Sequence, residues 1–271
     1  MNLHTTSNGN RPIAGAMALF VVWSAVTWLL EGRIETFLRP EAVTDRLVYA
    51  FVANVAIGIV GAVAVVRWLG GLGLARKAAG FGPAFRTSGS VAAGAVIGFA
   101  LYVIQGAPTL EPIILLNAFA QVFVVSVAEV LVCWAVIAAT VENRLEGHGK
   151  ILAGLAGAVT ASVLFGLYHY AHSAPFNTFP MVATLMVVGL VTGLYFFISR
   201  DVYGTMVFHN FLGTFGVAQA LKAADKLDTM ATLQMPLIVT ALAAVAVLLA
   251  ADHFLLRKGP PGSLGAHGAR H

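Results

Sequence analysis

The sequence has few charged residues. Asp, Glu, Lys and Arg make up only 10% of its 271 residues, whereas a soluble globular domain carries about 25%. Hydrophobic residues make up 59%, which excludes an ordinary soluble domain and predicts an integral membrane protein. The apolar runs are long enough for membrane-spanning helices and longer than the strands of a membrane barrel need. We therefore expect an all-α fold, a polytopic transmembrane helical bundle.

Cysteine is almost absent, and the basic residues form no patch. The single cysteine, Cys133, lies within an apolar run, which excludes a disulfide framework. The formal net charge is +4, but no basic stretch is interleaved with aromatic residues, so nucleic acid is not an expected partner. The first apolar run has no small-residue cleavage site before Glu31, so we expect it to be kept as a helix rather than removed as a signal peptide.

Apolar runs separated by polar turns predict about eight membrane spans. We expect one transmembrane domain over residues 12–256, with its motif-bearing core at residues 113–221 and disordered ends at residues 1–11 and 257–271. The charged stretch from Glu31 to Arg46 carries interleaved apolar residues, which is typical of a short amphipathic helix along the membrane surface. The predicted spans are Pro12–Leu30, Leu47–Leu69, Gly89–Gln105, Ile113–Thr140, Leu152–Ala171, Met181–Ser199, Tyr203–Leu221 and Met235–Leu256.

The basic residues predict the orientation of the bundle. Eight spans place both termini on one side of the membrane. Of the Lys and Arg residues, 11 fall on the side of the termini and 5 on the opposite side. Because Lys and Arg are enriched in cytoplasmic loops, we expect both termini in the cytoplasm and the protein in an inner or plasma membrane.

Glu129 is the most costly side chain in this apolar sequence. Every residue from 122 to 139 is apolar or a cysteine, except Ser126 and Glu129. A carboxyl group at membrane depth is neutral, paired or next to a water-filled cavity, and it usually marks function. Asn117 and Gln121 precede it at helical spacing and give the helix a polar face. Glu129 is therefore a candidate general base or metal ligand, and a protonated Glu that bonds a neighbouring helix is the alternative.

Imidazoles occur in two later runs. His169 and His172 are three residues apart at the end of the fifth run, so both rings fall on one helix face. They are candidate metal ligands with Glu129, whereas a core histidine at 169 and an interfacial one at 172 are the alternatives. His209 and Asn210 are adjacent in the seventh run, and their side chains point about 100° apart. Either could donate a hydrogen bond to an oxyanion, or the pair could join two helices.

In this order the motifs resemble the CPBP family, which includes type II CAAX prenyl proteases and bacteriocin-processing or Abi proteins. The family motifs are Glu-Glu-x-x-x-Arg, Phe-x-x-x-His and His-x-x-x-Asn/Asp. This chain has Glu129, then Phe165-x-x-x-His169, then His209. The resemblance implies a bundle of about eight spans and an intramembrane endopeptidase. It also implies that Glu129 and His169 activate a water molecule, and that His209 and Asn210 stabilise the oxyanion.

The first and third motifs depart from the family pattern. Only one Glu is present, directly after Ala128, and the position of the Arg holds Cys133 or Trp134, depending on which Glu is matched. The fourth residue after His209 is Gly213 instead of Asn, and Asn210 follows the His directly. A catalytically inactive scaffold or binding protein on the same fold is therefore one alternative.

A metal-dependent membrane enzyme is the other alternative. Glu129, His169, His172 and His209 form a mixed ligand set that suits zinc or iron, so a divalent metal is the one candidate cofactor, and the peptidase itself is of a glutamic type or metal-dependent. The expected partners are the lipid bilayer and a peptide or membrane-protein substrate, lipidated or not.

The predicted span boundaries create one geometric difficulty. His169 lies near the outer end of its span and His209 near the inner end of its own. At a rise of about 1.5 Å per residue, the two rings would differ in depth by roughly ten Å. A shared site requires helix tilt, or a fifth helix that starts later and continues past Ala171.

Overall fold

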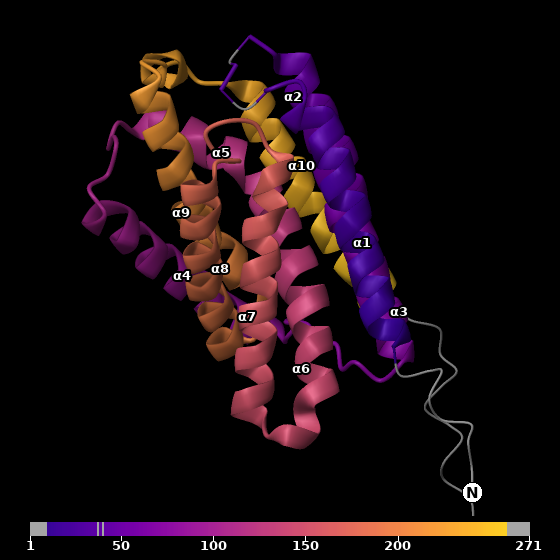
Figure 1. The fold of residues 1–271 in the computed structure, drawn as a ribbon. Helices are drawn as coiled ribbons and strands as arrows, with labels where there is room; N and C mark the ends of the chain where they lie inside the picture. The colour runs from indigo at the N-terminus through magenta and orange to yellow at the C-terminus, as the bar shows by residue number, and fades with distance from the viewer. Residues whose placement is uncertain (1–9, 37, 40, 259–271) are drawn as a thin grey trace, which may run out of the picture.

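The computed structural model describes residues 10–36, 38–39 and 41–258, which form a bundle of helices without a strand (Figure 1). Most residues of the expected disordered ends lie outside the described residues, but Arg11 begins the first helix and Arg257 ends the last. The first half of the bundle consists of α1 (Arg11–Thr27), η1 (Trp28–Gly32), α2 (Val43–Tyr49), η2 (Ala50–Gly61), α3 (Ala62–Gly71) and α4 (Ala84–Ile104). The second half consists of α5 (Pro112–Glu129), η3 (Val130–Ala138), α6 (Ala139–Leu145), η4 (Glu146–His148), α7 (Lys150–Tyr168), η5 (His169–Ala171), α8 (Phe179–Ser199), α9 (Val202–Ala223), η6 (Leu227–Met230), α10 (Met235–Ala251) and η7 (Asp252–Arg257).

Several of these elements join into continuous helices through π-helical segments. Among the described residues, seven such helices are long and apolar enough to cross a membrane. The eighth long helix, α9, has 22 residues and carries the polar residues of the third motif. The predicted polytopic bundle of about eight spans is therefore confirmed. The largest boundary difference concerns the fourth span, because its helix continues past Thr140 to His148.

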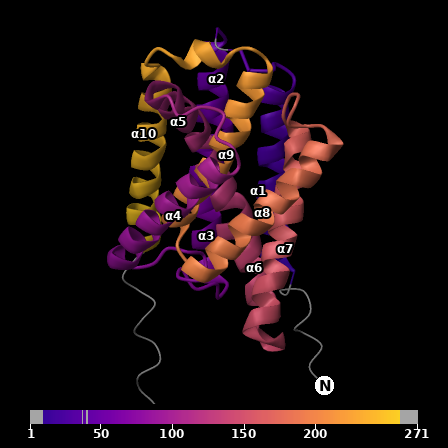
Figure 2. The ribbon, with the colours of Figure 1, turned by 90° about the vertical axis from the view of Figure 1, so that its left-hand side faces the viewer.

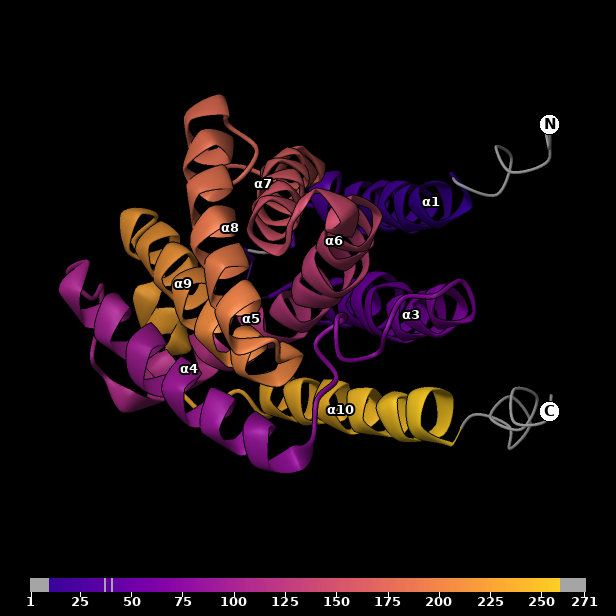
Figure 3. The same ribbon diagram turned by 90° about the horizontal axis from the view of Figure 1, so that it is seen from below.

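The helix of residues 112–148 is the centre of the bundle. In its most apolar stretch 94% of the residues are buried by other helices, compared with 50% or fewer in each of the other six apolar helices. Seen from below, the remaining helices surround α5 and α6 (Figure 3). A helix that is hydrophobic all round is the one expected in a buried position. Glu129 lies at the junction of α5 and η3, so side chains from several helices can reach it.

The hairpin of α6 and α7 extends below the ends of α8 and α9 (Figures 1 and 2). A bidentate ion pair between Arg200, at the end of α8, and Glu142, in α6, joins the lower end of α8 to the side of this hairpin. Because α7 begins lower than α9, their histidines can reach the same level from different distances along the helices. His169 lies nineteen residues after the start of α7, whereas His209 lies only seven residues after the start of α9. This stagger removes the predicted difference in depth, which assumed that both helices begin at the same membrane level.

Helix α9 is placed by its N-terminus and by α4. Asp201 caps α9, because its carboxylate accepts hydrogen bonds from the backbone N–H of Gly204 (2.8 Å) and from the hydroxyl of Thr87 (2.6 Å) in α4. The two helices touch closely through small residues, since a Cβ atom on Gly94 would overlap the carbonyl oxygen of Gly204. These contacts set the depth at which His209 enters the bundle.

The stretch from Glu31 to Arg46 does not form the predicted surface helix. Its described residues pass from the end of η1 through turns, and α2 already belongs to the second long helix. Glu31 itself is fully buried. The prediction was wrong because the charged residues of this stretch suggested a solvated segment, while one of them has its partners inside the bundle.

Candidate active site

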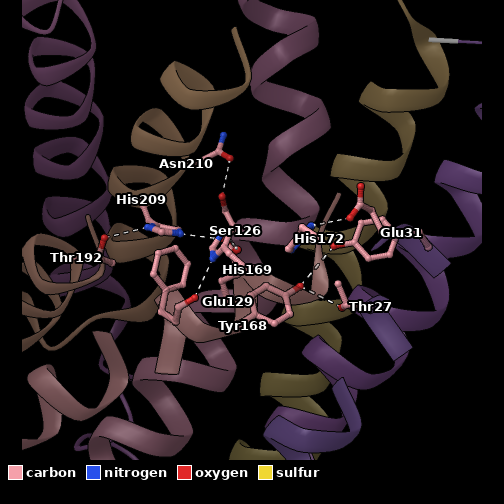
Figure 4. Close-up of polar contacts among 12 residues, drawn as sticks. Thr27, Glu31, Ser126, Glu129, Tyr168, His169, His172, Thr192, His209 and Asn210 are labelled. Carbon is pink, nitrogen blue, oxygen red and sulfur yellow. Dashed lines mark hydrogen bonds and ion pairs between the residues drawn. The ribbon is translucent and has the colours of Figure 1, made fainter. Parts of the chain in front are cut away.

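Glu129 is the centre of a buried polar cluster (Figure 4). Its Oε2 atom lies 3.0 Å from Nε2 of His209, and its Oε1 atom lies 3.7 Å from Nε2 of His169. All three residues are at most 7% exposed. The structure thus brings together three residues from α5, η5 and α9 that the sequence analysis selected as site residues.

His169 follows the last residue of α7 and turns its ring toward the bundle centre. Its Nδ1 atom lies 2.8 Å from the carbonyl oxygen of Phe165, one helical turn earlier. Because a carbonyl oxygen only accepts, Nδ1 carries the proton of the neutral ring. The lone pair is then on Nε2, the atom that faces Glu129. The Phe165-x-x-x-His169 spacing therefore sets both the direction and the tautomer of the imidazole.

His209 is held from both sides. The Thr192 hydroxyl in α8 donates its one hydrogen to the carbonyl oxygen of Val188 (3.0 Å), so it accepts from Nδ1–H of His209 (2.9 Å). With Nδ1 protonated, two arrangements are possible at Nε2. It either carries a second proton and donates a hydrogen bond to the Glu129 carboxylate, or it accepts a hydrogen bond from a neutral Glu129. In both arrangements one proton is shared between Glu129 and His209.

His172 is part of the buried cluster and not an interfacial residue. It is 4% exposed, and its ring stacks on that of His169 with centroids 5.2 Å apart and planes at 28°. Its Nδ1 atom lies 3.1 Å from Oε2 of Glu31. Figure 4 shows His209, Glu129, His169, His172 and Glu31 in a row across the centre of the bundle.

Glu31 is the buried site residue that the sequence analysis missed. The signal available was its spacing, because Trp23, Thr27 and Glu31 recur every four residues on one face of the first helix. Trp23 stacks on Tyr168 with ring centroids 3.8 Å apart, and the Thr27 hydroxyl lies 3.1 Å from the Tyr168 hydroxyl. This face therefore follows the end of α7 as far as His172.

Asn210 bonds α5 rather than the Glu129 cluster. Its carboxamide oxygen accepts a hydrogen bond from Ser126 (2.9 Å), and its nitrogen donates to the carbonyl oxygen of Phe119 (3.0 Å). The side chain thus joins α9 to α5, next to His209. A contribution of Asn210 to an oxyanion site stays a prediction.

The geometry distinguishes the two ways of matching the first motif. Ala128 packs against η2, where a Cβ atom on Gly58 would overlap its methyl group. A carboxyl group at position 128 would therefore point away from the histidines, whereas Glu129 faces them. The position of the motif's Arg is then Trp134, whose ring packs against those of Phe165 and His209 with centroids 5.4 Å away in each case. The position of the Arg is thus filled by aromatic packing.

Three of the four predicted metal ligands form a compact donor set. One ligand atom each from Glu129, His169 and His172 lies within 4.8 Å of the other two. Both imidazoles have outer partners of the kind that orient metal-bound histidines, the Phe165 carbonyl and the Glu31 carboxylate. Two imidazoles and a carboxylate suit zinc or iron, so the residues fit a divalent metal. His209 bonds the other carboxylate oxygen of Glu129.

The matched family covers the motif-bearing part of this chain. Residues 111–215 match the family described as Rce1-like, type II CAAX prenyl endopeptidase Rce1-like. Neither the curated proteins nor the solved structures gave a match to the chain. The matched region contains Glu129, His169 and His209, and it excludes the first helix and Glu31. Together with the apolar helices it identifies an integral membrane protein. The match over residues 111–215 confirms the resemblance to the CPBP family for this part of the chain.

Proposed function

We propose that the protein is an intramembrane endopeptidase in which Glu129 and His169 activate the attacking water. The observation that carries this proposal is the geometry at Glu129. Its Oε1 atom and the unprotonated Nε2 atom of His169 face each other at 3.7 Å. One water molecule can donate a hydrogen bond of about 2.8 Å to each of two such acceptors. Glu129 and His169 would thereby orient the water and accept its proton.

The proposed reaction uses the proton shared with His209. The water oxygen attacks the carbonyl carbon, and its proton passes to Glu129. The carbonyl oxygen becomes an oxyanion and accepts a hydrogen bond from Nε2–H of His209, whose Nδ1–H is fixed by Thr192. When the carbon–nitrogen bond breaks, Glu129 returns the proton to the leaving amine. Asn210 holds α9 in place through its bonds to α5. A hydrogen bond from its amide to the oxyanion is the alternative role, and the kcat of Asn210→Ala separates the two.

An apolar cavity lies beside this cluster and supports an apolar substrate. It has a volume of about 460 Å³ and lies between α2 and η2, α5 and the start of α10. Val125, one turn before Glu129, lines it, as does Tyr49, whose hydroxyl lies 3.5 Å from that of Tyr168. A pocket of this size and lining is typical of small-molecule or chain-like ligands. We therefore propose an apolar peptide segment or a lipidated peptide as the substrate.

The test is cleavage of a panel of lipidated and unlipidated peptides by the purified protein and by its Glu129→Gln variant. We expect cleavage by the wild type and a loss of at least about 10³-fold in the variant, because acid–base groups contribute about 10²–10⁴-fold and Glu129 also positions the water. Glu111→Gln, an exposed carboxyl group at the start of the same helix, is the control. Full activity of Glu129→Gln would refute the mechanism. Absence of any cleavage by the wild type, together with a stable protein partner, would favour the scaffold alternative.

A metal-dependent enzyme is the second candidate, favoured by the donor set of Glu129, His169 and His172. A bound zinc or iron ion would act as a Lewis acid and lower the pKa of its bound water. Metal analysis of the purified protein separates the two candidates. A stoichiometric metal whose removal by a chelator abolishes activity would support this candidate, whereas chelator-resistant cleavage would support the first.

A further inference from the structure

Glu31 has an unusually complete set of buried partners. Its side chain is fully buried, and both carboxylate oxygens accept hydrogen bonds from Ser173: Oε2 from the backbone N–H (2.9 Å) and Oε1 from the hydroxyl (2.5 Å). The third partner is Nδ1 of His172, 3.1 Å from Oε2. A buried carboxylate is costly unless paired and hydrogen-bonded, and here each oxygen has a partner. The three contacts fix its position relative to the loop after η5.

A close approach of two backbones brings Glu31 to this place. Gly32, the last residue of η1, contacts η5 so closely that a Cβ atom would overlap the carbonyl oxygen of Ala171. The stacked pair of Trp23 and Tyr168 holds the same two helices together further along. The end of the first helix is therefore packed directly onto the segment that carries His169 and His172.

Glu31 accepts a hydrogen bond from His172, and the ring of His172 stacks on that of His169. The carboxylate accepts from Nδ1–H of His172, which sets the tautomer and the rotation of that ring. The ring then stacks on that of His169, with centroids 5.2 Å apart and planes at 28°, and one of its nitrogens lies within 4.8 Å of the ligand atoms of Glu129 and His169. The His169 ring is thereby held between this stack and its hydrogen bond to Phe165.

We propose that Glu31 is a positioning residue of the active site. It fixes the tautomer and rotation of the His172 ring, and that ring holds the His169 imidazole in place facing Glu129. This role rests on the proposed function for its kinetic consequence. It assigns a task to a residue outside the region that matches the family, and it supplies a second buried carboxylate where the first motif has only one. The N-terminal helix is then part of the catalytic unit and not only a membrane anchor.

The kinetic test compares two substitutions of Glu31. Glu31→Ala removes the acceptor, and we expect kcat per folded molecule to fall about 10- to 100-fold with KM unchanged, as for outer partners of site histidines. Glu31→Gln keeps an oxygen for Nδ1–H and an amide that can donate to Ser173, so we expect it to stay within about threefold of the wild type. His172→Ala should lower kcat as much as Glu31→Ala, and the double variant should lose no more than either single one, because Glu31 acts through His172. Unchanged kcat in folded Glu31→Ala or His172→Ala, or additive losses, would overturn the proposal.

A matched control separates positioning from stability. Asp252 is also a buried carboxylate, 2.9 Å from the hydroxyl of Tyr203 and paired with Arg257, but it lies in η7 at the opposite end of α10 from the cavity. Asp252→Ala should lower the thermal stability in detergent while the kcat of the folded fraction stays unchanged. A comparable fall of kcat in this variant would show that the loss in Glu31→Ala is a general effect of a lost buried carboxylate.

A spectroscopic measurement keeps this inference separate from the proposed function. In protein with ¹⁵N-labelled histidine, His172→Ala assigns the ring signals, and we expect His172 to be protonated on Nδ1 in the wild type and to lose this fixed tautomer in Glu31→Ala. A His172 ring without a proton on Nδ1 would refute the proposal even if peptides are cleaved. If no peptide is cleaved but the tautomer changes as expected, the positioning contact stands and the proposed function fails.

Discussion

Nε2 of His209 lies 3.0 Å from Oε2 of Glu129, although 80 residues separate the two in the chain. The contact joins α9 to the central helix at the junction of α5 and η3. On the far side of the imidazole, Nδ1 lies 2.9 Å from the hydroxyl of Thr192 in α8. Three helices therefore share one hydrogen-bonded line, and in the proposed reaction its proton serves Glu129 or the substrate oxyanion.

The Thr192 hydroxyl should matter for both stability and activity. Thr192→Val keeps the shape of the side chain but leaves Nδ1–H of His209 without its acceptor. A buried donor without a partner costs about 1–3 kcal/mol, so we expect a lower free energy of unfolding. We also expect kcat to fall about tenfold, because the doubly protonated His209, whose Nε2–H is the proposed oxyanion donor, loses the acceptor of its Nδ1–H. Peptide cleavage and thermal unfolding in detergent measure the two effects.

Thr140→Val is the matched control for this substitution. Thr140 is buried in α6 and bonds the carbonyl oxygen of Val136 within its own helix, at 2.6 Å. Its loss should affect stability slightly and kcat not at all. Equal kcat values in Thr192→Val and the wild type would contradict the role assigned to Thr192 as the acceptor that holds His209.

Asn210 should act chiefly through the contact between α5 and α9. Asn210→Ala removes the acceptor of Ser126 and the donor to Phe119, so we expect a loss of about 1–3 kcal/mol in the free energy of unfolding. Ser126→Ala should cost less, because it removes one of the two bonds. In both variants the kcat of folded protein should stay within about threefold of the wild type. A fall of kcat by 100-fold or more in stable Asn210→Ala would instead make Asn210 an oxyanion donor.

Filling the apolar cavity should weaken substrate binding. Ala50 lines the cavity, and Ala50→Phe adds a ring to the space that we assign to the substrate. We expect KM to rise at least about tenfold with kcat nearly unchanged, because binding contacts are lost while the Glu129 cluster is untouched. Ala64→Phe, in a separate cavity lined by α3 and η7, is the control. A KM that does not change in Ala50→Phe would place the substrate elsewhere.

The contact of Gly32 with Ala171 should be sensitive to one methyl group. Gly32→Ala forces η1 away from η5, so we expect Glu31 to lose its bonds to Ser173 and His172 and kcat to fall as in Glu31→Ala. Gly70→Ala in α3 is the control, because no atom lies within 4 Å of its added Cβ. Wild-type kinetics in Gly32→Ala would show that the site does not depend on the close packing of these two segments.

The sequence was sufficient to predict the site residues that are costly to bury in a membrane. Glu129, His169 and His209 could be selected because polar side chains inside apolar runs cost free energy and usually mark function. Their order also resembles that of a known family. It was not sufficient for Glu31, since a carboxyl group at the end of an apolar run usually faces water or headgroups. His172 had the same ambiguity next to Ser173 and Pro175. The structure assigns both residues to the site, because His172 stacks on His169 and Glu31 contacts His172.

The sequence by itself determined a helical membrane protein, its long helices and the three motif residues, because hydrophobic length and the cost of burying charge are local properties of the chain. The tertiary structure decided the depth of each residue, since the stagger of the α6–α7 hairpin against α9 brings His169 and His209 to one level. It also decided the partners of each imidazole, the direction of Asn210 and the burial of Glu31. These depend on how helices far apart in the sequence pack against one another, and no local pattern records that packing.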